Sequence, residues 1–270
     1  MKEDRFGFGA NWARYLELVD ENRLLAAQEA LIRLVGRDDL SGLRFLDIGS
    51  GSGLHSLVAH RLGAEVVSFD YDTDSVDCTR VLRGDVDPAT WRVEQGSVLD
   101  LDYLATLGTF DIVYSWGVLH HTGSMWQAIE NAAGLVKPGG TFAIAIYNYK
   151  PGSTERWIWV KRHYCEGGPL MRQALVAGSY VRLWGPKICR DTLLHLDPAR
   201  SWRSYGARGM DAKVDLIDWV GGYPYEAAST KELLTFVEAL GFRGRVVFET
   251  SHHGCHELVY TRDSEAALGQ

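Results

Sequence analysis

Three glycines at alternate positions, Gly49, Gly51 and Gly53, constrain this chain more than any other feature of its sequence. A short apolar run that ends in Asp47 precedes them, and an amphipathic segment follows at once. This order predicts a strand, a tight turn and a helix. Because glycine lacks Cβ and adopts positive φ without strain, a ligand can approach such a backbone closely. Asp47 would lie at the carboxyl end of the strand, where open α/β sheets bind ligands.

The remaining pattern alternates strands and helices. Strands of the buried type are predicted at 65–72, 91–95, 110–116 and 141–148, with helical spacing between them. The helix before the last of these is predicted to continue to Val136, followed by a tight turn over 137–140. Further on, Ser229 and Glu232 predict a capping box, and residues 245–261 predict a hairpin. Strands and helices in this order predict a doubly wound sheet.

The motif Asp47-Ile48-Gly49-Ser50-Gly51-Ser52-Gly53 resembles, at every fixed position, the acidic three-glycine turn of class I S-adenosylmethionine (SAM) dependent methyltransferases. The G-x-G-x-x-G fingerprint of dinucleotide sites fits poorly, because Leu54 occupies its last glycine position. The ending Leu119-His120-His121 after the fourth strand and Lys137-Pro138-Gly139-Gly140 before the fifth are further traits of that family.

The resemblance implies an α/β fold with a doubly wound, seven-stranded sheet that is mostly parallel and has an antiparallel last strand. Helices would precede the sheet, with Asp20 capping the second, and a helical lid insertion would follow the fifth strand. The predicted divisions are an N-terminal helical cap (1–40), the first part of the SAM-binding core (41–148), the insertion (149–226), the end of the core sheet (227–262) and a tail (263–270).

The resemblance also implies SAM as the cofactor and S-adenosylhomocysteine (SAH) as the product. Asp47 and the glycines would hold the methionine part, and Asp70, about 20 residues further on, would accept the ribose hydroxyls. Ser97 stands where the family often has an acid, and its hydroxyl or the Val98 amide would contact the adenine. The predicted cofactor residues are Asp47, Gly49, Ser50, Gly51, Gly53, Asp70, Tyr71, Ser97, Val98, Ser115 and Trp116.

The loop after the fourth strand would border the methyl group. An imidazole there can remove a proton from a hydroxyl or an amine, so we predict a general base, His121 first and His120 second. The alternative is a structural pair, in which one ring binds the backbone and the other faces the cofactor. The predicted acceptor-binding residues are Trp12, Tyr15, His120, Tyr147 and Tyr225, although Trp12 and Tyr15 equally suit the core of an appended helix.

The charge and composition of the sequence restrict which molecules the protein is expected to bind. The net charge of -7 argues against nucleic acid, whose backbone needs a basic footprint. Residues 149–226 hold 12 Lys and Arg against 8 Asp and Glu, which suits an anionic acceptor or, alternatively, a solvated subdomain or dimer surface. Four scattered cysteines, no signal region and no spanning apolar run predict a cytoplasmic protein without membrane contact. The histidines near Cys255 are interpreted as loop residues, so no metal is predicted.

The sequence therefore predicts methyl transfer to oxygen or nitrogen of a small molecule, such as a carboxylate, a sugar or a natural-product intermediate. One alternative is an RNA or protein methyltransferase. Against it, Ser115-Trp116-Gly117-Val118 replaces the Asn/Asp-Pro-Pro-Tyr/Phe type of motif that many base- and amide-methylating enzymes carry. The other alternative is a SAM-binding module without catalysis. No feature of the sequence specifies an oligomeric state.

Overall fold

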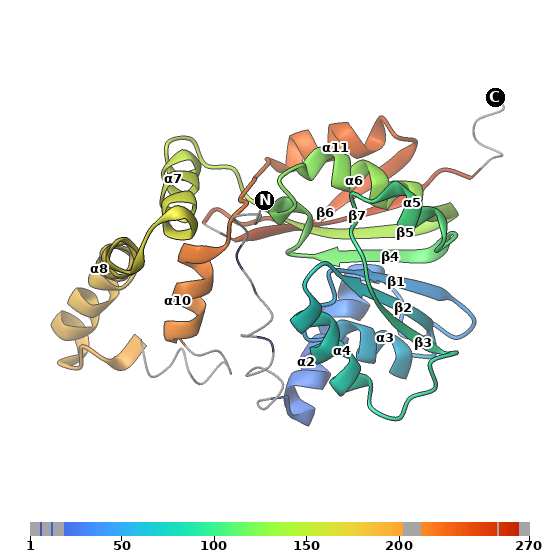
Figure 1. The fold of residues 1–270 in the computed structure, drawn as a ribbon, viewed down its shortest axis with the longest axis horizontal. Coiled ribbons are helices and arrows are strands. Elements are labelled where there is room, and N and C mark those ends of the chain that lie inside the picture. The colour runs from blue at the N-terminus through green and yellow to red at the C-terminus, as the bar shows by residue number, and fades with distance from the viewer. Residues whose placement is uncertain (1–5, 7–11, 13–18, 202–211, 253, 265–270) are drawn as a thin grey trace. The chain divides into compact units, whose positions relative to one another are not determined.

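The chain folds into two compact units, seen in a computed structural model that describes residues 6, 12, 19–201, 212–252 and 254–264 (Figure 1). The sheet unit comprises the described residues of 8–150 and 226–270. The helical unit comprises Phe6 and the described residues of 151–225. The helix predicted before Asp20 lies outside the described residues, apart from Trp12.

A seven-stranded sheet in the order β3-β2-β1-β4-β5-β7-β6 organises the sheet unit. Strands β1 to β5 are parallel to one another, and β7 runs antiparallel to both β5 and β6, which confirms the predicted topology. The winding reverses between the neighbouring strands β1 and β4, and doubly wound sheets bind ligands at such a point. The strands are β1 (Arg44–Ile48), β2 (Glu65–Asp70), β3 (Trp91–Gln95), β4 (Phe110–Trp116), β5 (Val136–Tyr147), β6 (Phe242–Phe248) and β7 (Cys255–Arg262).

Helices cover both faces of this sheet, as the doubly wound prediction requires (Figure 1). One face carries α2 (Glu21–Val35), α3 (Leu54–Arg61) and α4 (Thr73–Arg83), and the other carries α5 (Leu101–Ala105), α6 (Met125–Gly134) and α11 (Thr230–Glu238). The predicted cap of α2 is confirmed, because the Asp20 carboxylate accepts a hydrogen bond of 2.9 Å from Arg23 N.

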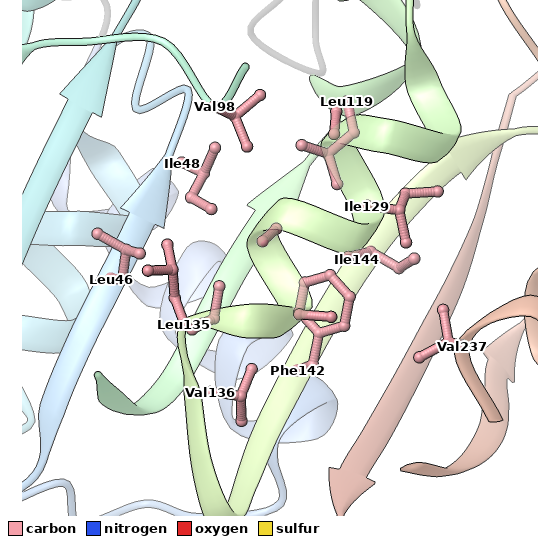
Figure 2. Packing of buried hydrophobic residues seen from close by; sticks show 14 of the residues in the cluster. Leu46, Ile48, Val98, Leu119, Ile129, Leu135, Val136, Phe142, Ile144 and Val237 are labelled. Carbon is pink, nitrogen blue, oxygen red and sulfur yellow. The ribbon is translucent and has the colours of Figure 1, made fainter. Parts of the chain in front are cut away.

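Two apolar cores follow from the alternation of side chains along the strands. Phe45 packs with the face that carries α2 to α4, whereas its neighbour Leu46 points to the opposite face. There Phe142 and Ile144 of β5 pack near Ile129 of α6, as Figure 2 shows. Burying each such side chain contributes about 1.5–3 kcal/mol. The central strands are thus packed on both faces, and their carboxyl ends set where the following loops begin.

The start of β5 differs from the sequence-based prediction. Helix α6 ends at Gly134, and the strand begins at Val136, before the predicted turn. The register with β4 shifts between the pairs Phe110–Val136 and Ile112–Thr141, so residues 137–140 form a bulge within the strand. The ladder on both sides of the bulge keeps these residues in the sheet, which local turn signals do not reveal.

The C-terminal part of the sheet unit follows the prediction closely. Ser229 N donates to Glu232 Oε2 (2.9 Å), and Glu232 N donates to Ser229 Oγ (3.3 Å), which confirms the capping box of α11. Strands β6 and β7 form the predicted hairpin. None of the helices within the described parts of the chain has the length and apolar character needed to cross a membrane.

The described part of the helical unit contains α7 (Ser153–Glu166), α8 (Pro169–His195) and α10 (Ala212–Gly221), which confirms a helical insertion after the fifth strand. A buried lysine of α7 links that helix to α10 and to Tyr225. Lys161 Nζ lies 4.4 Å from the ring centroid of Trp219 and 4.7 Å from that of Tyr225, and it donates to Trp219 O. Cation–π contacts of this kind are strongest where water is excluded.

Candidate functional site

The turn after β1 depends on glycine at each of its three alternate positions. Gly49, Gly51 and Gly53 have φ of +76°, +55° and +80°, a region that other residues rarely adopt. A Cβ at Gly49 would overlap the Val118 side chain, and one at Gly53 would lie 2.9 Å from Thr79 Cγ2. The turn therefore presents backbone, without Cβ atoms, at the carboxyl end of β1.

Asp70, the predicted ribose acid, closes this turn from the end of β2. Its Oδ2 accepts a hydrogen bond of 3.0 Å from Gly51 N, and its Oδ1 accepts one of 3.0 Å from Asp72 N. Burial raises the pKa of Asp70 to about 6, although these amide hydrogen bonds oppose the shift. Each carboxylate oxygen keeps a second lone pair for a ligand hydroxyl. The neighbouring Tyr71 is 52% exposed. The ribose role of Asp70 and the adenine role of Tyr71 remain predictions.

Asp47, predicted to hold the methionine part, is only 3% exposed. Ser56 Oγ in α3 donates a hydrogen bond of 2.5 Å to its Oδ2. Burial raises the pKa of Asp47 to about 7; the Ser56 hydrogen bond opposes this shift and the charge of Asp70 adds to it. This side chain therefore changes its charge near neutral pH, as groups at binding sites often do.

The predicted contacts at Ser50, Ser97 and Val98 also carry structural hydrogen bonds. Ser50 Oγ lies 2.9 Å from Thr79 Oγ1 in α4. Ser97 Oγ accepts from Leu99 N at 3.2 Å, and Val98 O accepts from Asn131 Nδ2 at 2.9 Å. The Val98 side chain is buried in the core beside Ile48 and Leu119 (Figure 2). Only the backbone of Val98 is thus available to an adenine ring.

Two predicted residues at the end of β4 have different environments. Ser115 is buried and donates to Ile48 O at 3.0 Å, so it ties β4 to the end of β1. Trp116 is 46% exposed, and its Nε1 donates to Glu257 Oε1 at 3.2 Å. Arg33 donates to the other oxygen of Glu257, also at 3.2 Å. Sequence reasoning missed Glu257; an acid amid the apolar residues of the last strand was the available signal.

The histidine pair lies in the turn η1 (Leu119–His121) after β4. His120 is fully buried, and its Nδ1 accepts a hydrogen bond of 3.4 Å from Tyr147 N. Its ring centroid lies 4.1 Å from that of Tyr147 and 4.5 Å from that of His121. His121 is partly exposed. The burial of His120 favours an orienting role for it, and His121 remains the predicted base.

The predicted acceptor-binding residues belong to different parts of the structure. Tyr147 contacts both histidines, and its ring centroid lies 5.6 Å from that of His121. Trp12 lies on the glycine turn instead, because a Cβ at Gly51 would be 2.9 Å from Trp12 Cε2. Tyr225 belongs to the helical unit, where it is buried against Trp219, and Tyr15 lies outside the described residues.

His55 is a further residue that the sequence analysis did not single out. It lies in the first turn of α3, directly after the three glycines, with its ring centroid 5.2 Å from that of Tyr114. Burial lowers the pKa of His55 to about 4, so its imidazole is neutral at physiological pH. The signal that could have identified His55 in the sequence was its place in the first helical turn after the glycine motif. Across the described chain, no three His, Cys, Asp or Glu side chains are grouped in a way that could hold a metal.

Comparisons with known proteins agree with this geometry. Residues 46–144 match the family model described as a methyltransferase domain. The ubiquinone biosynthesis O-methyltransferase of Brucella ovis is 30% identical over 148 residues, which cover 50% of this chain and 55% of that protein. The chain thus spans about half the length of the curated relatives that it matches.

Solved structures share the fold at low sequence identity. An O-methyltransferase family protein from Burkholderia thailandensis has a TM-score of 0.54 at 14% identity, covering 91% of this chain and 56% of that one. Magnesium protoporphyrin IX methyltransferase from Synechocystis, with bound SAH, has a TM-score of 0.52 at 14% identity, covering 89% and 84%. The family match over residues 46–144 and the shared fold bear out the resemblance of the glycine motif to class I methyltransferases.

Proposed function

We propose that this chain is a SAM-dependent methyltransferase that acts on oxygen or nitrogen of a small molecule. The observation that carries the proposal is the turn after β1, whose three positive-φ glycines expose backbone where the winding of the sheet reverses. The surrounding groups fit the cofactor, since Asp47 suits its ammonium group and Asp70 its ribose hydroxyls. Bound SAM supplies a methyl group on a sulfonium, which is already a reactive electrophile.

The protein's own contribution is to align the acceptor and to accept its proton. We assign proton acceptance to His121, which is partly exposed in the loop after β4. His120 orients it through their ring contact of 4.5 Å. Trp116 offers the face of an exposed indole, held through Nε1 by Glu257, and such a face favours a nearby sulfonium.

Two measurements test the proposal. Titration calorimetry with SAM and SAH measures cofactor binding, and incubation with methyl-labelled SAM and an extract of the source cells identifies the acceptor pool. Binding together with label in small molecules would support the proposal. Label in RNA or protein instead would favour the macromolecular alternative. SAM binding without label in any fraction would favour a non-catalytic module, and absence of SAM binding would contradict all three functions.

We further propose that the acceptor carries an acidic group. The helical unit has a cavity of about 160 Å³ between α7 and α8, with a largely apolar lining. Arg156 and Arg182 border it, and neither forms an ion pair or hydrogen bond with another described residue. Two guanidiniums beside an apolar hollow suit an organic anion. Once the labelled product identifies the acceptor, retention of the unmethylated acceptor on an anion exchanger at neutral pH would support this, whereas its passage in the unbound fraction would contradict it.

The proposed setting follows from composition. The net charge of -7 disfavours a nucleic-acid acceptor. The four cysteines form no disulfide, which fits the reducing cytoplasm that we propose as the location. Detection of the labelled acceptor in the cytosolic fraction of the source cells would test that location.

A further inference from the structure

A chain of buried hydrogen bonds runs behind the candidate site, from β3 to β1. Trp91 Nε1 donates to Ser68 Oγ in β2 at 2.8 Å, and Ser68 Oγ lies 2.7 Å from Ser56 Oγ in α3. Ser56 Oγ then donates to Asp47 Oδ2 at 2.5 Å. Trp91, Ser68 and Ser56 are fully buried, so water does not compete for these bonds.

The donors and acceptors in this series of hydrogen bonds can be ordered in one way only. An indole N–H donates and never accepts, so Ser68 must be the acceptor at that end. The Ser68 hydroxyl hydrogen is then available to Ser56, whose own hydrogen is committed to Asp47. Each bond polarises the next, and the last is charge-assisted when the carboxylate is ionised. The order of donors therefore favours the negative form of Asp47.

This series of hydrogen bonds ends at one oxygen of the Asp47 carboxylate, Oδ2, and does not reach the other oxygen, Oδ1. Asp47 Oδ1 forms no hydrogen bond with any residue that the structure describes. Asp47 is 3% exposed, and its Oδ1 is not one of the fully buried atoms that lack a hydrogen-bond partner, so this oxygen remains accessible to a ligand. Because burial raises the pKa of Asp47, a cationic ligand group would also restore its charge.

We infer that Ser56, Ser68 and Trp91 are positioning residues, which hold Asp47 so that its Oδ1 binds the ammonium of the cofactor's amino-acid part. This inference rests on the proposed function and deepens it, because it assigns the source of affinity for one portion of the cofactor to residues that do not touch the ligand. The adenosine portion is recognised elsewhere, at the end of β2 and the loop after β3.

The test compares two ligands on the full chain. SAH carries the amino-acid part, and 5′-methylthioadenosine lacks it while keeping the adenosine and the sulfur. We expect Ser56→Ala to weaken SAH about tenfold and to change methylthioadenosine affinity less than twofold, measured by calorimetry. Ser75→Ala is the matched control, because Ser75 is a buried serine of α4 outside the chain of bonds. It should change neither affinity by more than twofold.

Trp91→Phe is the second variant, and it removes the first donor while keeping an aromatic ring in β3. Since it acts through two intervening hydroxyls, we expect a smaller loss of SAH affinity, about threefold, again without loss of methylthioadenosine affinity. Equal weakening of both ligands in either variant would overturn the inference, because it would show a general disturbance of the fold. If the unmodified chain bound neither ligand, the proposed function itself would fail, which is a distinct result.

Discussion

The turn after β1 and the loop after β4 lie at the same edge of the sheet, but different kinds of contact hold them. Backbone groups fix the turn, since Gly49 N and Ser50 N both donate to Phe69 O, at 2.8 and 3.2 Å. In the loop, a buried side chain adds to the backbone hydrogen bonds, since His120 packs its ring against Tyr147. A backbone-held turn tolerates few substitutions, whereas a loop held also by side chains can vary with the acceptor. We propose cofactor binding for the first region and acceptor chemistry for the second.

Gly49→Ala should have the largest effect on stability and SAM affinity, because it changes the position where the turn contacts the loop. Its Cβ would overlap the Val118 side chain, and φ is +76° at this position. We expect a loss of about 2–3 kcal/mol in the free energy of unfolding and a loss of about hundredfold in SAM affinity. Gly42→Ala is the control, since its φ is +75° but a Cβ there would meet nothing within 4 Å. It should cost about 1 kcal/mol and leave affinity unchanged; equal effects would contradict the prediction.

The two histidines should separate activity from stability. His121→Ala should lower kcat about hundredfold with little change in Tm, because a general base contributes at least that factor. His120→Ala should instead lower the free energy of unfolding by about 2–4 kcal/mol, because it empties a fully buried ring position. Initial rates with the identified acceptor and thermal melts measure both. A His121→Ala enzyme with unchanged kcat would remove the general-base assignment.

Asp70→Ala should weaken SAM binding about tenfold without unfolding the domain. The variant loses the acceptor of Gly51 N and Asp72 N together with the predicted ribose contact. Asp74→Ala, an exposed acid in the first turn of α4, is the control and should leave affinity within twofold. Calorimetric titration measures both variants. Unchanged affinity in Asp70→Ala would refute the ribose assignment.

A smaller effect is expected in the pH dependence of stability. The folded-state pKa is about 7 for Asp47 and about 6 for Asp70, each above its usual 3.8. The native state therefore binds more protons than the unfolded state between about pH 4 and 7, so unfolding free energy falls as pH rises through that window. Asp47→Asn should remove part of this fall in the free energy of unfolding. Denaturant titrations at about pH 4.5 and about pH 7.5, near the two ends of the window, would measure the difference. An identical fall in the variant would exclude Asp47 as the titrating group.

The glycine motif and its surroundings were predictable because the physics there is local. Positive φ favours Gly49, Gly51 and Gly53 wherever the chain turns this sharply, and the spacing from Gly51 to Asp70 follows from one strand–helix–strand unit. The same reasoning gave the caps at Asp20 and Ser229. Each of these depends on residues close in the sequence, so periodicity and turn chemistry are enough to place it.

Contacts between distant strands were not predictable in this way. Glu257 meets Trp116 across 141 positions of the chain, and Ser115 reaches back 67 positions to Ile48. The bulge at 137–140 likewise depends on its pairing with β4. Sequence patterns indicate which face of a strand a residue occupies but not which partner lies opposite.

The sequence by itself determined the sheet and its glycine turn, because local backbone preferences and periodic burial encode them. The class of domain followed from the resemblance of the glycine motif to a known family. Only the tertiary structure decided that His120 is buried while His121 is partly exposed. It also decided that Trp91, Ser68 and Ser56 converge on Asp47. The physical reason is that burial and hydrogen-bond partners arise when elements far apart in the chain pack together, and no local pattern records them.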